Sequence, residues 1–521
     1  MSIERLVFCL IPLLGLSCGA AAQTPISAIE WLDRTAPLAT PPPEVESFLP
    51  PLPGEPPVAG TAGTPAVAVQ TLDGPQDGPV GLLSHRVTGL PIDLWSGMDG
   101  ARAQRMIGAL NVDDLPAMQT LLYSLLLSET LPPKGNGQDI QFLTARIDKL
   151  TELGAVNAAL ALIDHAGSER HADLFRRHFD LSLIAGVESD ACARMAARPD
   201  LAPGYDARVY CMARLGDWPA AMLTFSSMRA LGEFDKRSET LLSLFLEPEL
   251  VEDTPPLAPP ARATPLVFRL QESIGQPLAT ATLPRAYAFA DLRNVSGWKA
   301  ELEAVERLAR SGAVPENRLI GVYGARKAAA SGGIWDRVSA IQAFDAAMQS
   351  ADAQEVSDTL TAAWAAMRDA RLEVPFANLY GADLARLDLP GLAARRVAFR
   401  VAMLSPAYES AANRMVPVGP EETFLAALAR GRSADAIAHS ARARAVATAF
   451  AGDGARDETT KGMISQQRLG EVILMAMQQY SHAAAGEIKD AAGALATLRA
   501  VGLEDTARRA ALQLLILDRR N

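Results

Sequence analysis

The chain has 521 residues, with 49 Lys and Arg against 60 Asp and Glu, so its net charge is −11. A charge of this sign argues against nucleic-acid binding, which needs clustered Lys and Arg to neutralise phosphates, and against adsorption to anionic lipid. Hydrophobic residues make up 49% of the chain but aromatic residues only 6%, so alanine and leucine supply most of the apolar surface. Sheets favour aromatic and β-branched residues, and we therefore expect an all-α fold.

Residues 1–22 have the layout of a secretory signal peptide. Arg5 lies in a short charged start, and residues 6–16 form an apolar run. The small residues Ala20 and Ala22 follow in the A-x-A pattern of a cleavage site. We expect cleavage after Ala22 and a mature protein that is periplasmic or secreted.

Cys18 raises lipid attachment as an alternative to simple export. Lipid attachment normally has leucine three places before the cysteine, and here Gly15 stands in that place. The apolar run is also too short, and too broken by Pro12, to span a bilayer. We therefore expect simple export rather than a lipoprotein, with no membrane span in the mature chain.

Residues 23–80 are predicted to form a proline-rich, disordered arm. Prolines cluster at 41–43, 50–53 and 56–57, with Gly, Thr and Asp after them. Such a segment has too little apolar surface to offset the entropy lost on ordering, and proline biases it towards extended polyproline II.

A short candidate docking motif lies near the start of this arm. Ser27 and Glu30 form a capping box, which favours one helical turn that shows Ile29, Trp31 and Leu32. These three apolar residues are the predicted docking motif. The alternatives are an arm that folds back onto its own body and an arm that is only a spacer.

Helical periodicity begins downstream of the arm. Apolar residues recur at helical spacing in three stripes: Ile140, Leu143, Ile147 and Leu150; Trp298, Leu302, Val305 and Ala309; and Val356, Leu360, Trp364 and Met367. Glycine or proline interrupts the pattern at short intervals. Short helices joined by short loops predict antiparallel helix pairs, stacked as an α-solenoid.

A second proline-rich stretch divides this helical region. Residues 81–247 are predicted as helical lobe 1 and residues 285–521 as helical lobe 2. Residues 248–284 are predicted as a proline-rich linker and irregular segment between them. One continuous body with a long surface loop is the alternative.

Cys192 and Cys211 are the cysteines left after removal of the signal peptide. They stand equally far from the centre of a break at residues 199–204, so in an antiparallel helix pair they lie at the same height. Export to an oxidising compartment then favours a disulfide between them. Two buried free thiols are the alternative.

A half-motif recurs four times, with glycine followed five residues later by alanine. The pairs are Gly154 and Ala159, Gly216 and Ala221, Gly431 and Ala436, and Gly502 and Ala507. Glycine in the left-handed conformation ends one helix, and the small alanine lets the next helix cross close to it.

The Gly216 copy is the fullest, with Trp218, Ala221, Met222 and Phe225 after it. It resembles the second helix of a tetratricopeptide repeat, although the first-helix pattern and the 34-residue period of that family are absent. The chain as a whole is similar to exported bacterial helical-repeat proteins of unassigned function. This resemblance implies a tetratricopeptide-like helical repeat and no catalytic residues.

His165, His171 and His178 are candidate metal ligands. His171 and His178 lie two helical turns apart, about 10 Å by helical rise. That distance is too long for two ligands of one zinc, whose bonds are each about 2 Å. We predict no metal site and no cofactor, and we expect these histidines on a solvated, partly paired helix face.

These observations predict a non-enzymatic, exported α-helical scaffold that mediates protein–protein interaction in the bacterial envelope. The partner is predicted to be one or more envelope proteins that the sequence does not identify. The alternative is an envelope enzyme or ligand-binding protein, for example a cell-wall-related one, whose site forms between the helical lobes. A solenoid can assemble such a site from residues far apart in sequence.

Overall fold

Helices joined by loops make up the part of the chain that the computed structural model describes, namely residues 78–133, 138–328, 330–451 and 458–517. Those residues contain isolated bridges, Val80 with Thr130 and Leu83 with Ser128, and no strand. The all-α class predicted from the composition is confirmed.

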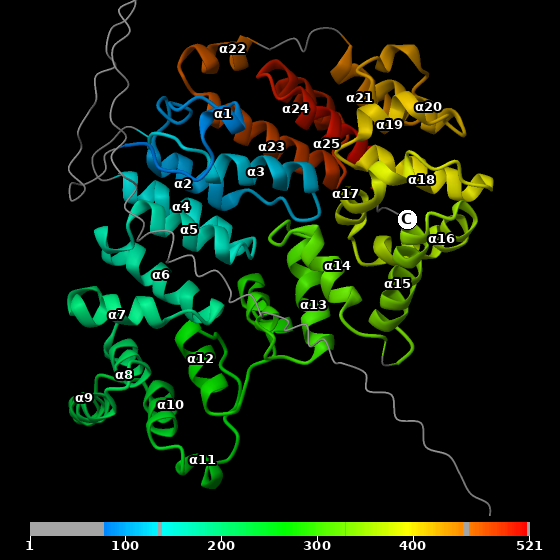
Figure 1. Ribbon diagram of the computed structural model, residues 1–521. Helices are drawn as coiled ribbons and strands as arrows, with labels where there is room; N and C mark the ends of the chain where they lie inside the picture. The colour runs from blue at the N-terminus through cyan, green and yellow to red at the C-terminus, as the bar shows by residue number, and fades with distance from the viewer. Residues whose placement is uncertain (1–77, 134–137, 329, 452–457, 518–521) are drawn as a thin grey trace, which may run out of the picture. The chain divides into compact units, whose positions relative to one another are not determined.

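The helices follow one another closely along the chain (Figure 1). The first group is α1 His85–Thr88, α2 Gly100–Ala109, α3 Pro116–Leu127, α4 Gln138–Glu152, α5 Val156–Ala166, η2 Ser168–Arg170 and α6 Ala172–Ala185. The second group is α7 Ser189–Ala197, η3 Pro199–Leu201, α8 Tyr205–Arg214, α9 Trp218–Leu231, α10 Lys236–Leu246, α11 Leu250–Asp253 and α12 Pro265–Ser273.

The remaining helices complete the described chain. They are η4 Thr280–Thr282, η5 Arg285–Arg293, α13 Trp298–Ala309, α14 Glu316–Gly324, α15 Ile334–Ser350, α16 Ala353–Asp369, α17 Glu373–Leu384, α18 Leu392–Leu404 and α19 Tyr408–Arg414. The last are α20 Pro420–Ala429, η6 Ser433–Asp435, α21 Ala441–Phe450, α22 Glu458–Ser465, α23 Leu469–Ala485, α24 Lys489–Ala500 and α25 Glu504–Ile516. Neighbours along the chain pack against each other, as in α4 with α5, α8 with α9, and α24 with α25.

The three predicted apolar stripes form buried helix faces. All four residues of the stripe in α13 are buried, and so are all four of the stripe in α16. In α4 three of the four are buried, and Ile140 is half-buried at the first turn. A period of 3.6 residues therefore identified the core-facing side of these helices correctly.

Three of the four glycine–alanine half-motifs join two helices as expected. Gly154, Gly216 and Gly502 have φ of 83°, 91° and 89°, a region that glycine enters without steric cost. The alanine after each of them is fully buried. The Gly431 copy differs, because a 3-10 turn and an extended stretch follow it, and Ala436 stays outside any helix.

Buried apolar side chains form three clusters among the described residues. The second cluster runs from 288 to 404 and the third from 175 to 274, so each is built from helices close in sequence. The first cluster is different, because it mainly joins residues 90–184 to residues 399–514. Its interior therefore consists of the first and the last helices together.

Contacts between α2, α3, α23 and α25 make this connection (Figure 1, blue and red helices). The amide of Ala117 donates to Oε1 of Gln513 at 2.8 Å, and the amide of Gly470 donates to the carbonyl of Leu94 at 3.1 Å. Arg102 of α2 forms an ion pair with the buried Glu471 of α23. These contacts thus bring helices from the two ends of the described chain together.

Part of the segment predicted as an irregular linker is helical. Thr264 caps α12 by accepting from the amide of Val267, and Pro265 occupies the first helical turn. Leu266, Leu270 and Ile274 bury one side of this helix in the third cluster. Whether residues 247 and 284 bound two separate lobes stays a prediction.

The predicted absence of a membrane span can be compared with the length and apolar character of the helices. Among the described residues, no helix combines the length and the apolar character that crossing a membrane requires. The predicted signal peptide at residues 1–22 lies outside the described residues, as do residues 23–77 of the predicted arm.

The contact between the first and last helices leads to a first prediction. A Cβ added at Gly470 would lie 2.5 Å from Cε3 of Trp95, a side chain that is only 1% exposed. We expect Gly470→Ala to lower the free energy of unfolding by about 1–3 kcal/mol, the usual cost of overpacking. Urea denaturation of the variant and the parent chain measures this difference.

Gly321→Ala is the matched control. Gly321 lies inside α14, and apart from its chain neighbours and the backbone of its own helix no atom stands within 4 Å of its added Cβ. Alanine is the better helix former by about 1 kcal/mol, so this variant should be as stable as the parent or more so. Equal stability of Gly470→Ala and Gly321→Ala would contradict the close packing of Gly470 against Trp95.

Candidate functional site

The α7–α8 pair carries the predicted disulfide. The structure brings Cys192 of α7 and Cys211 of α8 into disulfide geometry, with their Cα atoms 5.0 Å apart. Both side chains are buried in the third cluster. The position of the break at residues 199–204, midway between the two cysteines, was the signal that paired them.

A buried carboxylate joins this pair to α12. Glu188, just before α7, is fully buried, and its Oε1 accepts from the hydroxyl of Tyr210 at 2.8 Å. Arg214 at the end of α8 and Arg269 of α12 stand 3.2 and 3.3 Å from the same oxygen. Burial, and then Glu188 itself, raise the pKa of Tyr210 far above its ordinary value, so this tyrosine remains a hydrogen-bond donor.

A second cluster of the same composition lies between α13, α14 and α15. Glu306 is 2% exposed and accepts from the hydroxyl of Tyr323 at 2.6 Å. Arg337 binds both of its carboxylate oxygens, at 2.7 and 2.9 Å, and Arg310 stands 3.4 Å from Oε2. Two arginines and a tyrosine thus satisfy this buried charge.

These two clusters border a cavity of about 1080 Å³. We call it the α12–α13 cleft. Its polar lining consists of Arg269, Glu272, Thr280, Asp291, Ser296, Glu303, Glu306, Arg307, Arg310 and Arg337. Four arginines and four acidic residues give the lining no net charge. Which ligand the cleft can bind therefore depends on which of these charged side chains lack an ion-pair partner within the protein.

Arg307 is the cation of the cleft that has no acidic partner. Its Nη1 donates to the carbonyl of Thr280 at 3.0 Å and its Nη2 to the carbonyl of Leu283 at 2.7 Å. Among the described residues no carboxylate lies within ion-pair distance of it. Burial lowers the pKa of Arg307, and the neighbouring cations Arg285 and Arg310 lower it further.

Asp291 is the complementary anion. Its Oδ2 accepts from the hydroxyl of Thr280 and its Oδ1 from the hydroxyl of Ser296, the latter at 2.6 Å. Within the described chain it makes no ion pair. Asp291 and Arg307 therefore both contact Thr280, one at its hydroxyl and the other at its carbonyl, without neutralising each other.

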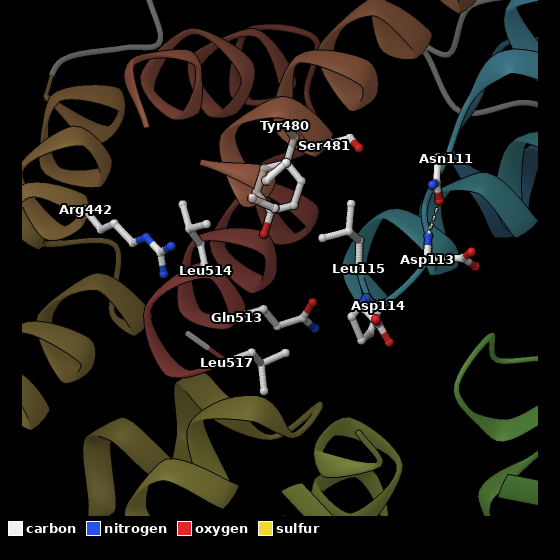
Figure 2. Close-up of a pocket in the computed structure, with 13 residues that line it drawn as sticks. Asn111, Asp113, Asp114, Leu115, Arg442, Tyr480, Ser481, Gln513, Leu514 and Leu517 are labelled. Atoms are coloured by element: carbon white, nitrogen blue, oxygen red, sulfur yellow. Dashed lines mark hydrogen bonds between the residues drawn. The ribbon is translucent and has the colours of Figure 1, made fainter. Parts of the chain in front are cut away.

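A smaller cavity of about 380 Å³ lies where the first and last helices meet (Figure 2). Residues 111 and 113–116 line one side of it, and residues of α21, α23 and α25 line the other. The hydroxyl of Tyr480 donates to the carbonyl of Ala510 at 2.8 Å, and Gln513 binds the amide of Ala117. These polar groups hold helices together, so we do not take this cavity as the functional site.

The outward side of α9 is a surface of another kind. Six of its exposed side chains are uncharged, namely Pro219, Leu223, Ser226, Ser227, Ala230 and Leu231, and Trp218 and Arg229 of the same helix are exposed as well. Leu223 and Leu231 are each 70% exposed, whereas Ala221 and Phe225 on the inward side are buried. We call these six residues the α9 outer face. In the sequence, the lack of any charge from residue 218 to residue 228 was the signal that could have identified it.

His165 and His171 are exposed, as expected for a solvated face, whereas His178 departs from that expectation. His178 is only 4% exposed, its Nε2 stands 3.2 Å from Oδ1 of Asp164, and burial lowers its pKa. His171 caps α6 by accepting from the amide of Asp173. His178 is inward because it shares a helix face with Phe175 and Phe179. No group of three or more His, Cys, Asp or Glu is placed to hold a metal ion in the described part of the chain.

The predicted docking motif of Ile29, Trp31 and Leu32 lies outside the described residues. The structure neither brings it to a site nor separates it from one. It stays a prediction.

Comparison with known proteins assigns no family to the chain. No protein-family model matches it, and no curated protein and no solved structure matches it. The α12–α13 cleft and the α9 outer face are therefore the candidate functional regions of the described chain.

The cysteine pair gives a second prediction. Mass mapping without reductant should recover Cys192 joined to Cys211, and Cys192→Ser should lower the free energy of unfolding by about 2–5 kcal/mol. The loss arises because a link between residues 19 positions apart restricts the unfolded chain. Reduction of the parent should cause a similar loss and leave the variant unchanged. Two alkylatable thiols in the unreduced parent would rule the disulfide out.

Asp180 of α6 gives a third prediction, on pH. Burial raises the pKa of Asp180 to about 6, with Asp206 adding to the rise and Arg176 and Arg177 opposing it. A raised carboxyl pKa means that the folded state disfavours the charge, so its contribution to stability falls as pH rises from about 4 to about 6. The penalty at neutral pH is at most about 3 kcal/mol, and less where water reaches the side chain.

Asp180→Asn should therefore raise the thermal midpoint at pH 7.5 and leave it nearly unchanged at pH 4. Asp369→Asn, at an exposed position at the end of α16, is the control and should shift neither midpoint. A stabilisation by Asp180→Asn of equal size at both pH values would contradict a raised pKa for Asp180.

Proposed function

We propose that this protein is an exported helical scaffold that binds another protein of the bacterial envelope through the α9 outer face. In this proposal consecutive helix pairs stack as a tetratricopeptide-like α-solenoid. The signal-peptide pattern of residues 1–22 and the disulfide geometry of Cys192 and Cys211 support export to an oxidising compartment.

The α9 outer face is the observation that carries the proposal. Exposed helix faces of globular proteins are usually charged or polar, as α16 is with Gln354, Glu355, Asp358 and Arg368. On α9 two leucines are 70% exposed, and no charged residue lies within the first 11 residues of the helix, 218–228. Contiguous exposed apolar surface of this kind marks interaction sites. A partner that covers it would gain about 25 cal/mol for each Å² of apolar surface removed from water.

The helices beneath α9 hold this face in a fixed position. α9 packs against α8 and α10, and α8 is linked to α7 through Cys211. Asp217 caps the start of α9 by accepting from the amide of Ala220 at 3.2 Å. A face that is ordered before binding loses little conformational entropy when a partner arrives.

Charged residues lie around the face, and Arg229, which is inside its sequence range, places its guanidinium 5.3 Å from the ring centroid of the inward Phe225. Asp217 lies exposed before the first turn of α9, and Arg229 and Glu233 lie exposed at its other end. An apolar centre with a polar rim is the usual anatomy of a protein–protein interface.

Site-specific photo-cross-linking tests the proposal. A photoreactive amino acid placed at Leu223 in the producing bacterium should yield a discrete adduct of higher mass, because the partner covers this position. The same label at Thr361, an exposed position on α16, is the control and should yield none. Leu231→Asp should reduce the adduct at Leu223 several-fold with an unchanged thermal midpoint, since Leu231 is exposed.

Identical adducts from Leu223 and Thr361, or no adduct from either, would contradict the proposal. An adduct at twice the mass of the chain would assign the α9 outer face to self-association instead.

A further inference from the structure

The α12–α13 cleft has the dimensions of a ligand site. Its volume of about 1080 Å³ is at the upper end of small-molecule pockets. Small side chains form much of its wall, among them Ala279, Ala281, Ala288, Ala300 and Ala304. The polar groups that project among them therefore determine what the cleft accepts.

Most of the charge in this lining is already neutralised by the protein itself. Glu306 is satisfied by Arg337, Arg310 and Tyr323. Glu272 pairs with Arg269 and, at 2.6 Å, with Arg293. These groups fix the walls and offer little to a ligand.

Glu303 stands 3.7 Å from Lys299 in an exposed ion pair, so Arg307 and Asp291 are the charges left over. Each contacts Thr280, so they lie within the reach of one residue, yet they form no ion pair with each other. A guanidinium has more N–H donors than the two that Arg307 uses on carbonyl groups. A carboxylate has about four acceptor sites. Asp291 uses two of them on the hydroxyls of Thr280 and Ser296, so it can also accept hydrogen bonds from an ammonium group.

We propose that the α12–α13 cleft binds a small zwitterion of the class of amino acids and short peptides, with its carboxylate at Arg307 and its ammonium group at Asp291. Such a ligand places a negative charge beside Arg307 and a positive charge beside Asp291, two residues that have no ion-pair partner among the described residues. Charge-assisted hydrogen bonds of this kind are the stronger ones in proteins.

Other ligand classes fit the lining less well. A polyanion such as phosphate would meet four carboxylates, Glu272, Asp291, Glu303 and Glu306, in the same cavity. A purely apolar ligand would leave Arg307 and Asp291 desolvated without partners, which is costly. The site is also separate in sequence from the α9 outer face, so it is independent of the proposed scaffold function.

Isothermal titration calorimetry with trialanine as the probe tests this proposal. We expect trialanine with free termini to bind at one site per chain. The same peptide with an acetylated amino terminus and an amidated carboxyl terminus should bind at least about ten-fold more weakly, the loss expected for one charge-assisted contact. Inorganic phosphate should not compete.

Two variants locate the site. Arg307→Gln and Asp291→Asn should each weaken trialanine binding at least about ten-fold, and Asp291→Asn is close to isosteric, so its fold should be preserved. Arg307→Gln removes the bonds to Thr280 and Leu283, so Arg307→Lys accompanies it and should retain more of the binding. Arg432→Gln and Asp435→Asn are the matched controls, because this exposed pair lies outside the cleft.

The proposal is overturned if trialanine gives no saturable heat, if the blocked peptide binds equally well, or if phosphate displaces the peptide. Binding that survives both Arg307→Gln and Asp291→Asn would also overturn it. None of these outcomes affects cross-linking at Leu223, so failure here is distinguishable from failure of the scaffold proposal.

Discussion

Buried glutamates neutralised by arginines across helix contacts recur throughout the described structure. Glu188, Glu306, Glu422 and Glu471 are each no more than 2% exposed. Each has at least one arginine partner on another helix, from α12 in the first case to α2 in the last. Leaving such a carboxylate without its partner costs about 3–5 kcal/mol.

This constraint matters because the rest of the packing is rich in alanine. Faces of small side chains approach closely but offer few protrusions that distinguish one register from the next. A buried carboxylate tolerates only the register that brings its arginine within reach. We infer that these charge pairs, more than side-chain shape, select how neighbouring helices meet, a role that buried polar groups are known to have in coiled coils.

The sequence predicted what is local and missed what is distant. Helical stripes identified the buried sides of α13 and α16, and the distance from a break paired Cys192 with Cys211. An apolar stripe predicts that a helix face is buried, but it does not identify the helix that buries it. The packing of α3 against α25 could therefore not be predicted from the stripes. The burial of the glutamates was also missed. A charged residue in a helical segment is expected to be solvated, and the sequence does not show which distant arginine pairs with it. The α12–α13 cleft depends on two such clusters, and its residues were not foreseen for the same reason.

The closure of the first core has a consequence for the order of folding. The hydrogen bond between Ala117 and Gln513 joins positions 396 residues apart, and α25 supplies Leu512 and Leu514 to the same core. During synthesis, α2 and α3 therefore emerge long before α23 and the 13-residue helix α25, which pack against them. Contacts so distant in sequence slow folding. The helices α2 and α3 thus reach their native packing only after α23 and α25 have been synthesised.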